Sequence, residues 1–228
     1  QILHFRQAFH GRSGYTLSLT NTAEPRKTQY FPKFPWPRIV NPMLRFPSTP
    51  EGLEATMTLE RQAVAEIEAA VARHGHDLAG LIIEPIQGEG GDNHFRAEFL
   101  NKLPQLPHKH EFLLIFYEVQ TGFGTTVKWL SFEHFDFEPD VFAFAKKTQI
   151  CGLAAGPRVD EVDSVFKISS RINSTWGGNL VDMVRCQKII EVIEEDGLLA
   201  NATEVGAHLL AGISGLERLF PGKVTNSR

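Results

Sequence analysis

The stretch DVFAFAKKTQICG, residues 140–152, decides the expected fold. Its five mostly apolar residues, 141–145, follow a proline and an aspartate and fit a parallel strand that is covered on both faces. Lys146 and Lys147 therefore lie at the carboxyl end of this strand, where open α/β sheets bind their ligands. An amine held there in apolar surroundings has a lowered pKa and can attack a carbonyl. Without further context the lysines favour an ordinary basic turn, because lysine is mostly a surface residue.

The composition is typical of a soluble globular protein. The chain has 228 residues, 42% hydrophobic and 22% charged, which can bury one large core or two small ones. A net charge of -4 with scattered basic residues gives no general attraction to nucleic acid or to an anionic membrane. Cys151 and Cys186 are too few for a disulfide framework or a metal site, and no apolar run approaches the roughly 18 residues of a spanning helix, so a cytoplasmic location is expected. The chain opens on a strand-like segment without an initiator methionine, so we expect a fragment.

Other strands and helices are predicted before and after residues 140–152. Apolar runs predict strands over residues 1–8, 78–83 and 111–117. Apolar periodicity predicts a long helix over 53–74 and another over 180–196, and a short helix is predicted over 95–103.

The segment 20–50 is rich in proline and aromatic residues. Its prolines exclude a helix or a central strand, because each one lacks a backbone donor and has a fixed φ. The sequence instead predicts an ordered loop pinned by four aromatic side chains, Tyr30, Phe31, Phe34 and Trp36.

Five motifs occur in a fixed order along the chain. They are AFHGRSGYTLSLTNT (8–22), EPIQGEGGD (84–92), EVQTGFG (118–124), DVFAFAKKTQICG (140–152) and STWGGN (174–179). Together they resemble the motifs of class III pyridoxal-phosphate-dependent aminotransferases. The resemblance implies a fold-type-I large domain, which is an α/β fold with a mainly parallel sheet flanked by helices. It also implies pyridoxal 5'-phosphate as the cofactor, and it makes the basic-turn reading of the lysines the weaker one.

Within that family, FPKFPWPRI (31–39) and KKTQICG (146–152) resemble the branch that acts on L-lysine. This branch transfers the ε-amino group to 2-oxoglutarate and forms 2-aminoadipate 6-semialdehyde and glutamate. The resemblance further implies a homodimer, with residues 1–196 as the central part of the cofactor-binding domain and 197–228 as the start of a truncated small domain. Three alternatives stay open: another ω-aminotransferase acting on ornithine or 4-aminobutyrate, a catalytically inactive structural module, and an unstable product of gene prediction.

The resemblance assigns roles to residues around the cofactor. Lys147 corresponds to the lysine that forms the Schiff base and then moves the proton, and Lys146 is the less favoured candidate. We expect the two lysine side chains to diverge, because neighbouring strand residues point to opposite faces. Phe9 would stack on the cofactor ring, and Gln120 would bond its phenolic oxygen and contact the substrate. Thr175 would reach across a dimer interface to the cofactor phosphate of the other subunit. For Gln120 and Thr175 an ordinary loop amide and a Ser/Thr turn remain alternatives.

Two charged residues resemble substrate contacts. Arg12 corresponds to the residue that binds the substrate carboxylate, for which a planar guanidinium is suited. Glu89 corresponds to an acidic switch that pairs with an arginine near the carboxyl terminus and moves when a dicarboxylate arrives. A surface arginine and a solvated loop glutamate are the alternatives. The glycine-rich turn around Glu89 matches neither a P-loop nor a dinucleotide fingerprint, so we do not expect it to bind phosphate.

The sequence departs from the family pattern at two positions. Tyr117 stands where an aspartate normally pairs with the pyridine nitrogen of the cofactor, and a phenol with a reference pKa of about 10 cannot hold that charge at neutral pH. Glu118 cannot replace the aspartate unless a bulge turns it, because neighbouring strand residues point to opposite faces. Val127 stands where glycine is usual, so we expect local strain or a shifted loop.

Overall fold

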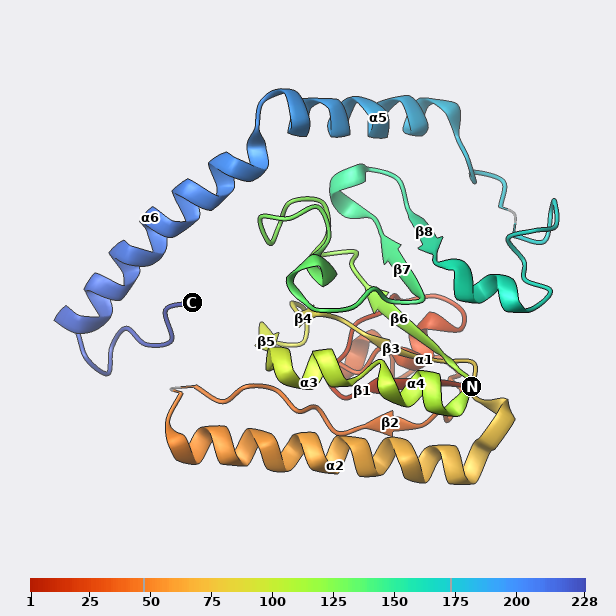
Figure 1. Ribbon diagram of the computed structural model, residues 1–228, viewed down its shortest axis with the longest axis horizontal. Helices are drawn as coiled ribbons and strands as arrows, with labels where there is room; N and C mark the ends of the chain where they lie inside the picture. The colour runs from red at the N-terminus through yellow and green to blue at the C-terminus, as the bar shows by residue number, and fades with distance from the viewer. Residues whose placement is uncertain (47, 173) are drawn as a thin grey trace.

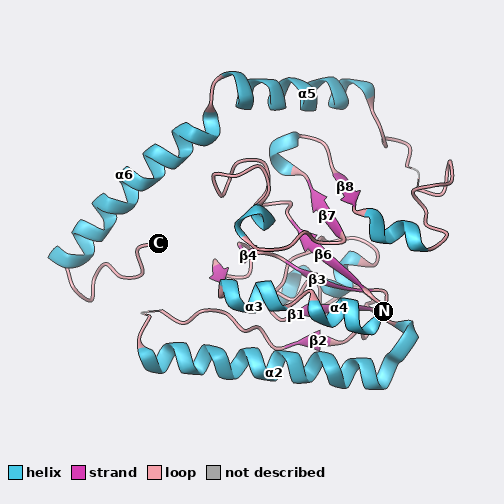
Figure 2. Ribbon diagram, viewed as in Figure 1, coloured by secondary structure: helices cyan, strands magenta, loops and turns pink. Residues whose placement is uncertain are grey.

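A six-stranded sheet forms the centre of the computed structural model, which describes residues 1–46, 48–172 and 174–228. Pro47 of the proline-rich segment lies outside the described residues. The strand order is β2 (Arg38–Ile39), β1 (Ile2–Phe5), β3 (Gly80–Ile83), β6 (Leu113–Tyr117), β7 (Val141–Phe144) and β8 (Gly152–Ala155). All neighbouring pairs are parallel except β7 and β8 (Figures 1 and 2). The predicted mainly parallel α/β sheet is therefore confirmed.

The longest helix, α2 (Pro50–His74), covers one face of the sheet (Figure 1). It begins after Thr49, whose side chain accepts a hydrogen bond from the Gly52 N–H, and Pro50 suits the first turn because its missing donor is not needed there. It ends at Gly75, which has a φ of +49° that a residue with a side chain adopts less easily. The helix predicted over 53–74 is confirmed, with a slightly earlier start.

The two faces of the sheet have different chemistry. One row of side chains from β1, β3 and β6 packs against α2 and α3 (Ala97–Lys102) in the hydrophobic core: Leu3, Phe5, Leu81, Ile83, Leu114 and Phe116. Because side chains alternate along a strand, the intervening residues point to the opposite face, here called the site face. His4, Ile82, Ile115 and Tyr117 lie on it.

The remaining elements surround this sheet. The short helix predicted over 95–103 is confirmed as α3, and α4 (Gln105–His110) forms in the segment that follows it. α5 (Leu180–Glu195) passes over the end of the sheet that holds β7 and β8, and α6 (Leu198–Leu219) extends away from it (Figure 1). The other short elements among the described residues are α1 (Thr16–Leu19), the hairpin of β4 (Ile86–Gln87) with β5 (Asn93–His94), and 3₁₀ turns at Pro25–Lys27, Gly75–Asp77, Ser131–His134, Lys146–Thr148 and Pro157–Glu161.

Two local predictions on loops have different outcomes. Tyr30 and Phe31 do not pin the proline-rich loop, since they are 82% and 54% exposed. Phe34 and Trp36 instead form a near-parallel aromatic stack with Tyr15, at centroid distances of 5.0 to 6.1 Å. The strain expected at Val127 is confirmed: its φ is +63°, a left-handed conformation that is unfavourable for a β-branched residue.

Candidate active site

The carboxyl ends of β3, β6 and β7 bring ionisable groups of the chain together. Ile83 of β3 pairs with Phe116 of β6, and Tyr117 pairs with Ala143 of β7. Glu84, which directly follows β3, and Tyr117 are consequently neighbours on the site face. Lys146 and Lys147 follow β7 by two and three residues, at the same edge of the sheet.

The two lysines approach the same residue, Gln120. The Lys146 Nζ donates to the side-chain Oε1 of Gln120 at 3.3 Å, and the Lys147 Nζ donates to the main-chain oxygen of Gln120. Our expectation that the two lysine side chains diverge is therefore wrong. It assumed strand alternation, but the strand ends at Phe144 and the lysines begin a 3₁₀ turn, with Lys146 at a φ of +48°.

Lys147 has the electrostatic properties of a reactive amine. Partial burial lowers its pKa, and the positive charge of Lys146 lowers it further. Gln120, which accepts the hydrogen bond from Lys147, packs directly against Gly88. A Cβ on Gly88 would lie 2.6 to 2.8 Å from the atoms of the Gln120 amide group, so a larger residue would not fit there. The glycine-rich turn therefore packs closely against the loop after β6.

Glu84 and Phe9 meet at the same edge. The Phe9 N–H donates to the Glu84 Oε1 at 2.7 Å, and the Glu84 side chain is buried. Burial raises the pKa of Glu84 to about 7, although the hydrogen bond from Phe9 and the charge of Lys146 both act to lower it. Glu84 is thus a carboxyl group that gains or loses its proton near neutral pH.

Tyr117, which is partly buried, contacts the buried His10 beside Glu84. Their rings meet edge to face, with centroids 4.8 Å apart and planes at 84°. Burial raises the pKa of Tyr117 to about 12, and the nearby Glu84 contributes, so the phenol is neutral at physiological pH. Burial lowers the pKa of His10 to about 3, and neither ring nitrogen has a hydrogen-bond partner.

Glu118 points to the other face of the sheet, as the alternation of strand side chains predicts. It is buried, and its carboxylate accepts hydrogen bonds from the Thr121 hydroxyl at 2.6 Å and the Phe132 N–H at 2.9 Å. These bonds fix the loop after β6. Glu118 does not replace the aspartate expected at position 117.

Three of the predicted site residues are not joined to this group by any described contact. Arg12 has an exposed side chain, and Thr175 is exposed in a turn closed by the Ser174 oxygen and the Gly177 N–H. Glu89 forms an ion pair with Lys27 of the proline-rich loop. That partner was not foreseen, because the two residues are 62 positions apart and nothing local links them.

His10 and Glu84 were not among the predicted site residues. A glutamate directly after a buried parallel strand is a signal that sequence reasoning could have used. His10 gave no comparable signal, because a single histidine in a loop has no spacing to interpret.

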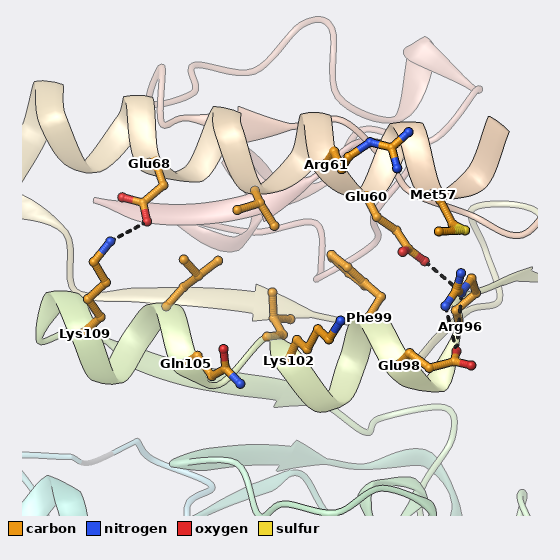
Figure 3. A pocket seen from close by; sticks show the side chains of 13 residues that line it. Met57, Glu60, Arg61, Glu68, Arg96, Glu98, Phe99, Lys102, Gln105 and Lys109 are labelled. Carbon is orange, nitrogen blue, oxygen red and sulfur yellow. Dashed lines mark hydrogen bonds and ion pairs between the residues drawn. The ribbon is translucent and has the colours of Figure 1, made fainter. Parts of the chain in front are cut away.

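A hollow of about 660 Å³ lies on the other face, between α2 and the pair α3 and α4. Figure 3 shows Glu60, Arg96 and Glu98 at one end of it and Glu68 with Lys109 at the other. Its charged lining residues are largely paired with one another, and the sheet separates it from Lys147. In the part of the chain that the structure describes, no group of three His, Cys, Asp or Glu side chains could hold a metal ion, and no helix could span a membrane.

Comparison with known proteins gives a family match over nearly the whole chain. The family model described as aminotransferase class-III matches residues 1–224. The L-lysine-epsilon aminotransferase of Mycobacterium tuberculosis is 52% identical over 231 residues, which cover 100% of this chain and 50% of the relative. The 4-aminobutyrate aminotransferase of Schizosaccharomyces pombe is 35% identical and is covered over 47% of its length.

A solved structure agrees with the sequence comparison. The lysine aminotransferase from M. tuberculosis in the internal aldimine form superposes with a TM-score of 0.91 at 53% identity, covering 97% of this chain and 50% of the other. The chain spans about half the length of the curated relatives it matches.

Proposed function

Because the chain belongs to the class-III aminotransferases, we propose that it forms part of an enzyme that transfers the ε-amino group of L-lysine to 2-oxoglutarate. The products would be 2-aminoadipate 6-semialdehyde and glutamate, and the cofactor is pyridoxal 5'-phosphate. The observation that carries this proposal is the amine of Lys147, which has a lowered pKa and contacts Gln120 at the carboxyl end of the sheet.

The residues around Lys147 fit this cofactor. Gly88 leaves the space that the Gln120 amide occupies, and the buried nitrogens of His10 are unpaired polar atoms beside position 117. Phe9 follows β1 at the same edge of the sheet, with its N–H bonded to Glu84. When bound, pyridoxal phosphate withdraws electrons from the carbon that carries the substrate's amino group.

The chain's own residues would do the rest of the chemistry. The Lys147 Nζ would attach the cofactor and later hold and move the substrate proton, which a lowered pKa favours because more of the amine is unprotonated. The Gln120 Oε1 faces Lys146, so its amide N–H groups would donate to the cofactor oxygen. The Phe9 ring would cover one side of the site and exclude water from it.

Substrate recognition and assembly extend the proposal. Arg12 would bind a substrate carboxylate with its guanidinium. Glu89, which forms an ion pair with Lys27 in this structure, would be the acidic switch that pairs with an arginine near the carboxyl terminus and moves when a dicarboxylate arrives. Thr175, on an exposed turn, would reach the cofactor phosphate of a second subunit in a homodimer. Residues 1–196 would form the central part of the cofactor domain, and α6 would begin the small domain after Gly197.

A second candidate function, an inactive module that keeps the fold, is favoured by one observation. Tyr117 is neutral and partly buried where the family pattern has an aspartate, so this position cannot pair with a protonated pyridine nitrogen. Another ω-aminotransferase activity is the nearest enzymatic alternative, since a 4-aminobutyrate aminotransferase is among the relatives.

Reduction of the cofactor-loaded chain tests the proposed function. The purified chain is mixed with pyridoxal phosphate, scanned for a visible band, reduced with borohydride and mapped by peptide mass. We expect the label on Lys147, and we expect it to persist in Lys146→Arg and to disappear in Lys147→Arg. Label on Lys146 in the Lys147→Arg variant would exchange the roles of the two lysines, and no specific label on the wild-type chain would favour the inactive module.

The amino donor is tested on the same loaded chain. L-Lysine, L-ornithine and 4-aminobutyrate are added separately, and loss of the visible band is followed. The proposal requires the fastest loss with lysine, whereas a faster loss with ornithine or 4-aminobutyrate would move the chain to another ω-aminotransferase group.

A further inference from the structure

Glu84 is a buried carboxyl group that the proposed mechanism does not use. It follows β3 directly and lies next to Tyr117 on the site face, because the register pairs Ile83 with Phe116. Its described hydrogen bond, from the Phe9 N–H, uses Oε1 and leaves Oε2 without a described donor. A carboxylate of this kind can still accept a hydrogen bond from a ligand.

We propose that Glu84, directly after the neighbouring strand β3, is a positioning residue that supplies the negative charge that Tyr117 cannot carry. The inference rests on the proposed function, since the group that would respond to this charge is the pyridine nitrogen of the cofactor. A negative charge near that nitrogen favours its protonated form, which is the better electron sink.

The groups described around Glu84 are neutral or positively charged, so Glu84 is the source of negative charge among them. Tyr117 on β6 stays neutral at physiological pH, and His10, packed on Tyr117, is neutral as well. Lys146, from the turn after β7, is the cation whose charge acts on Glu84, and it favours the ionised carboxylate. Cys151 is the other group that acts on Tyr117, and among these neighbours Glu84 is the one carboxylic acid.

Burial of a carboxyl group at this position destabilises its ionised form, which argues against a purely structural role for Glu84. Burial outweighs both stabilising neighbours, so the group titrates near pH 7 and not near 4.5. A glutamine at this position would accept the same Phe9 N–H without that penalty. A functional use of the charge gives a reason for a carboxylate here.

The test compares two cofactors in two variants. Glu84→Gln keeps the shape and the acceptor for Phe9 but removes the charge. Glu66→Gln is the matched control, because Glu66 also accepts a backbone N–H, from Val40 at 2.7 Å, but lies on α2 on the opposite face of the sheet. Binding is measured by absorbance titration at pH 8 with pyridoxal phosphate and with its 1-deaza analogue, in which a carbon replaces the pyridine nitrogen.

We expect Glu84→Gln to weaken binding of pyridoxal phosphate about tenfold, corresponding to loss of one charge-assisted contact. Binding of the deaza analogue should change less than about twofold, and Glu66→Gln should leave both affinities unchanged. Equal losses for both cofactors, or no loss for either, would overturn the inference and leave the proposed function standing. No binding of pyridoxal phosphate by the wild-type chain would overturn both.

The wild-type chain provides a second readout if Glu84→Gln does not fold. As the pH falls through about 7, Glu84 takes up a proton and its charge is lost. The preference for pyridoxal phosphate over the deaza analogue should therefore decrease below pH 7. Titration of Lys147 affects both cofactors alike, so a preference that is constant from pH 6 to 8 would contradict the inference.

Discussion

Replacing Tyr117 by aspartate should give the buried His10 ring an acid partner and thereby change how folding stability depends on pH. In the native chain the two rings meet at 4.8 Å and both His10 nitrogens lack a partner. Truncating the partly buried Tyr117 also removes packing, at a cost below the roughly 3 to 5 kcal/mol typical of a fully buried aromatic residue. Tyr117→Asn is the matched control, because asparagine loses the same ring and has nearly the same shape as aspartate but carries no charge.

The magnitude follows from the pKa of His10, which is 6.5 in an unfolded chain and about 3 in the native one. A group whose native pKa is lowered stabilises the fold above its unfolded pKa, and this stability is lost as the pH falls. Between pH 7 and pH 5 the His10 side chain takes up a proton in the unfolded chain but not in the native one. This difference lowers the free energy of unfolding by about 2 kcal/mol. Pairing with the introduced carboxylate would let native His10 keep its proton and would remove this loss.

Glu84 acts in the opposite direction over the same range. Its native pKa of about 7 lies above the value of 4.5 in an unfolded chain, so its contribution is present at low pH and lost as the pH rises. Between pH 5 and pH 7 that loss is also about 2 kcal/mol. The two groups therefore nearly cancel in the wild-type chain, and only a comparison of variants separates them.

The assay is urea unfolding of both variants at pH 5, 6 and 7. We expect the free energy of unfolding of Tyr117→Asp to rise, relative to that of Tyr117→Asn, by about 2 kcal/mol between pH 7 and pH 5. NMR titration of the His10 ring should show its pKa raised in the aspartate variant alone. Parallel pH profiles, or a His10 that stays neutral beside the introduced carboxylate, would refute the coupling between positions 10 and 117.

Three further changes test the fold and the site. Arg158→Met should lower the free energy of unfolding by about 3 to 5 kcal/mol, because Asp140, which also accepts the Leu114 N–H, would lose the cation 2.9 Å away; a loss below about 1 kcal/mol in urea unfolding would contradict the role of this pair. Val127→Gly should raise the free energy of unfolding by about 1 kcal/mol, since it relieves a φ of +63°, and no gain in thermal unfolding would mean that the strain is not stored there. Gly88→Ala should cost about 1 to 3 kcal/mol and reduce borohydride labelling of Lys147, because its methyl group would meet the Gln120 amide at 2.6 Å; unchanged labelling would detach Gln120 from the site.

The sequence predicts the elements of this fold better than their pairing. Apolar runs identify β3, β6 and β7, and the period of the apolar residues identifies α2, because burial on one face or on both leaves a local pattern. The antiparallel strand β8 has no such signature, since GLAA is a short segment that also occurs in turns and helices. Its direction depends on its contact with β7.

Motifs in the sequence predicted some residues of the candidate site, and the structure shows which of these lie together. Lys147 and Gln120 were identified from the sequence, and the structure brings them into contact. The ion pair of Glu89 with Lys27 was not predictable, because it joins loops distant in sequence. The expected divergence of the two lysines failed because the end of a strand was placed too late by one residue, and beyond a strand the alternation rule no longer holds.

The effect of the tyrosine at position 117 depends on the residues that surround it. In the sequence, Tyr117 replaces an aspartate of the family pattern and removes its negative charge. Loss of that charge by itself predicts an impaired site. In the structure the same residue packs edge to face on a histidine whose ring nitrogens have no hydrogen-bond partner, and it lies beside a glutamate that titrates near neutral pH. On our proposal, the negative charge at this edge of the sheet comes from Glu84, the residue that directly follows the adjacent strand β3. A loss of affinity in Glu84→Gln that is confined to pyridoxal phosphate would show that this carboxylate acts on the pyridine nitrogen in place of residue 117.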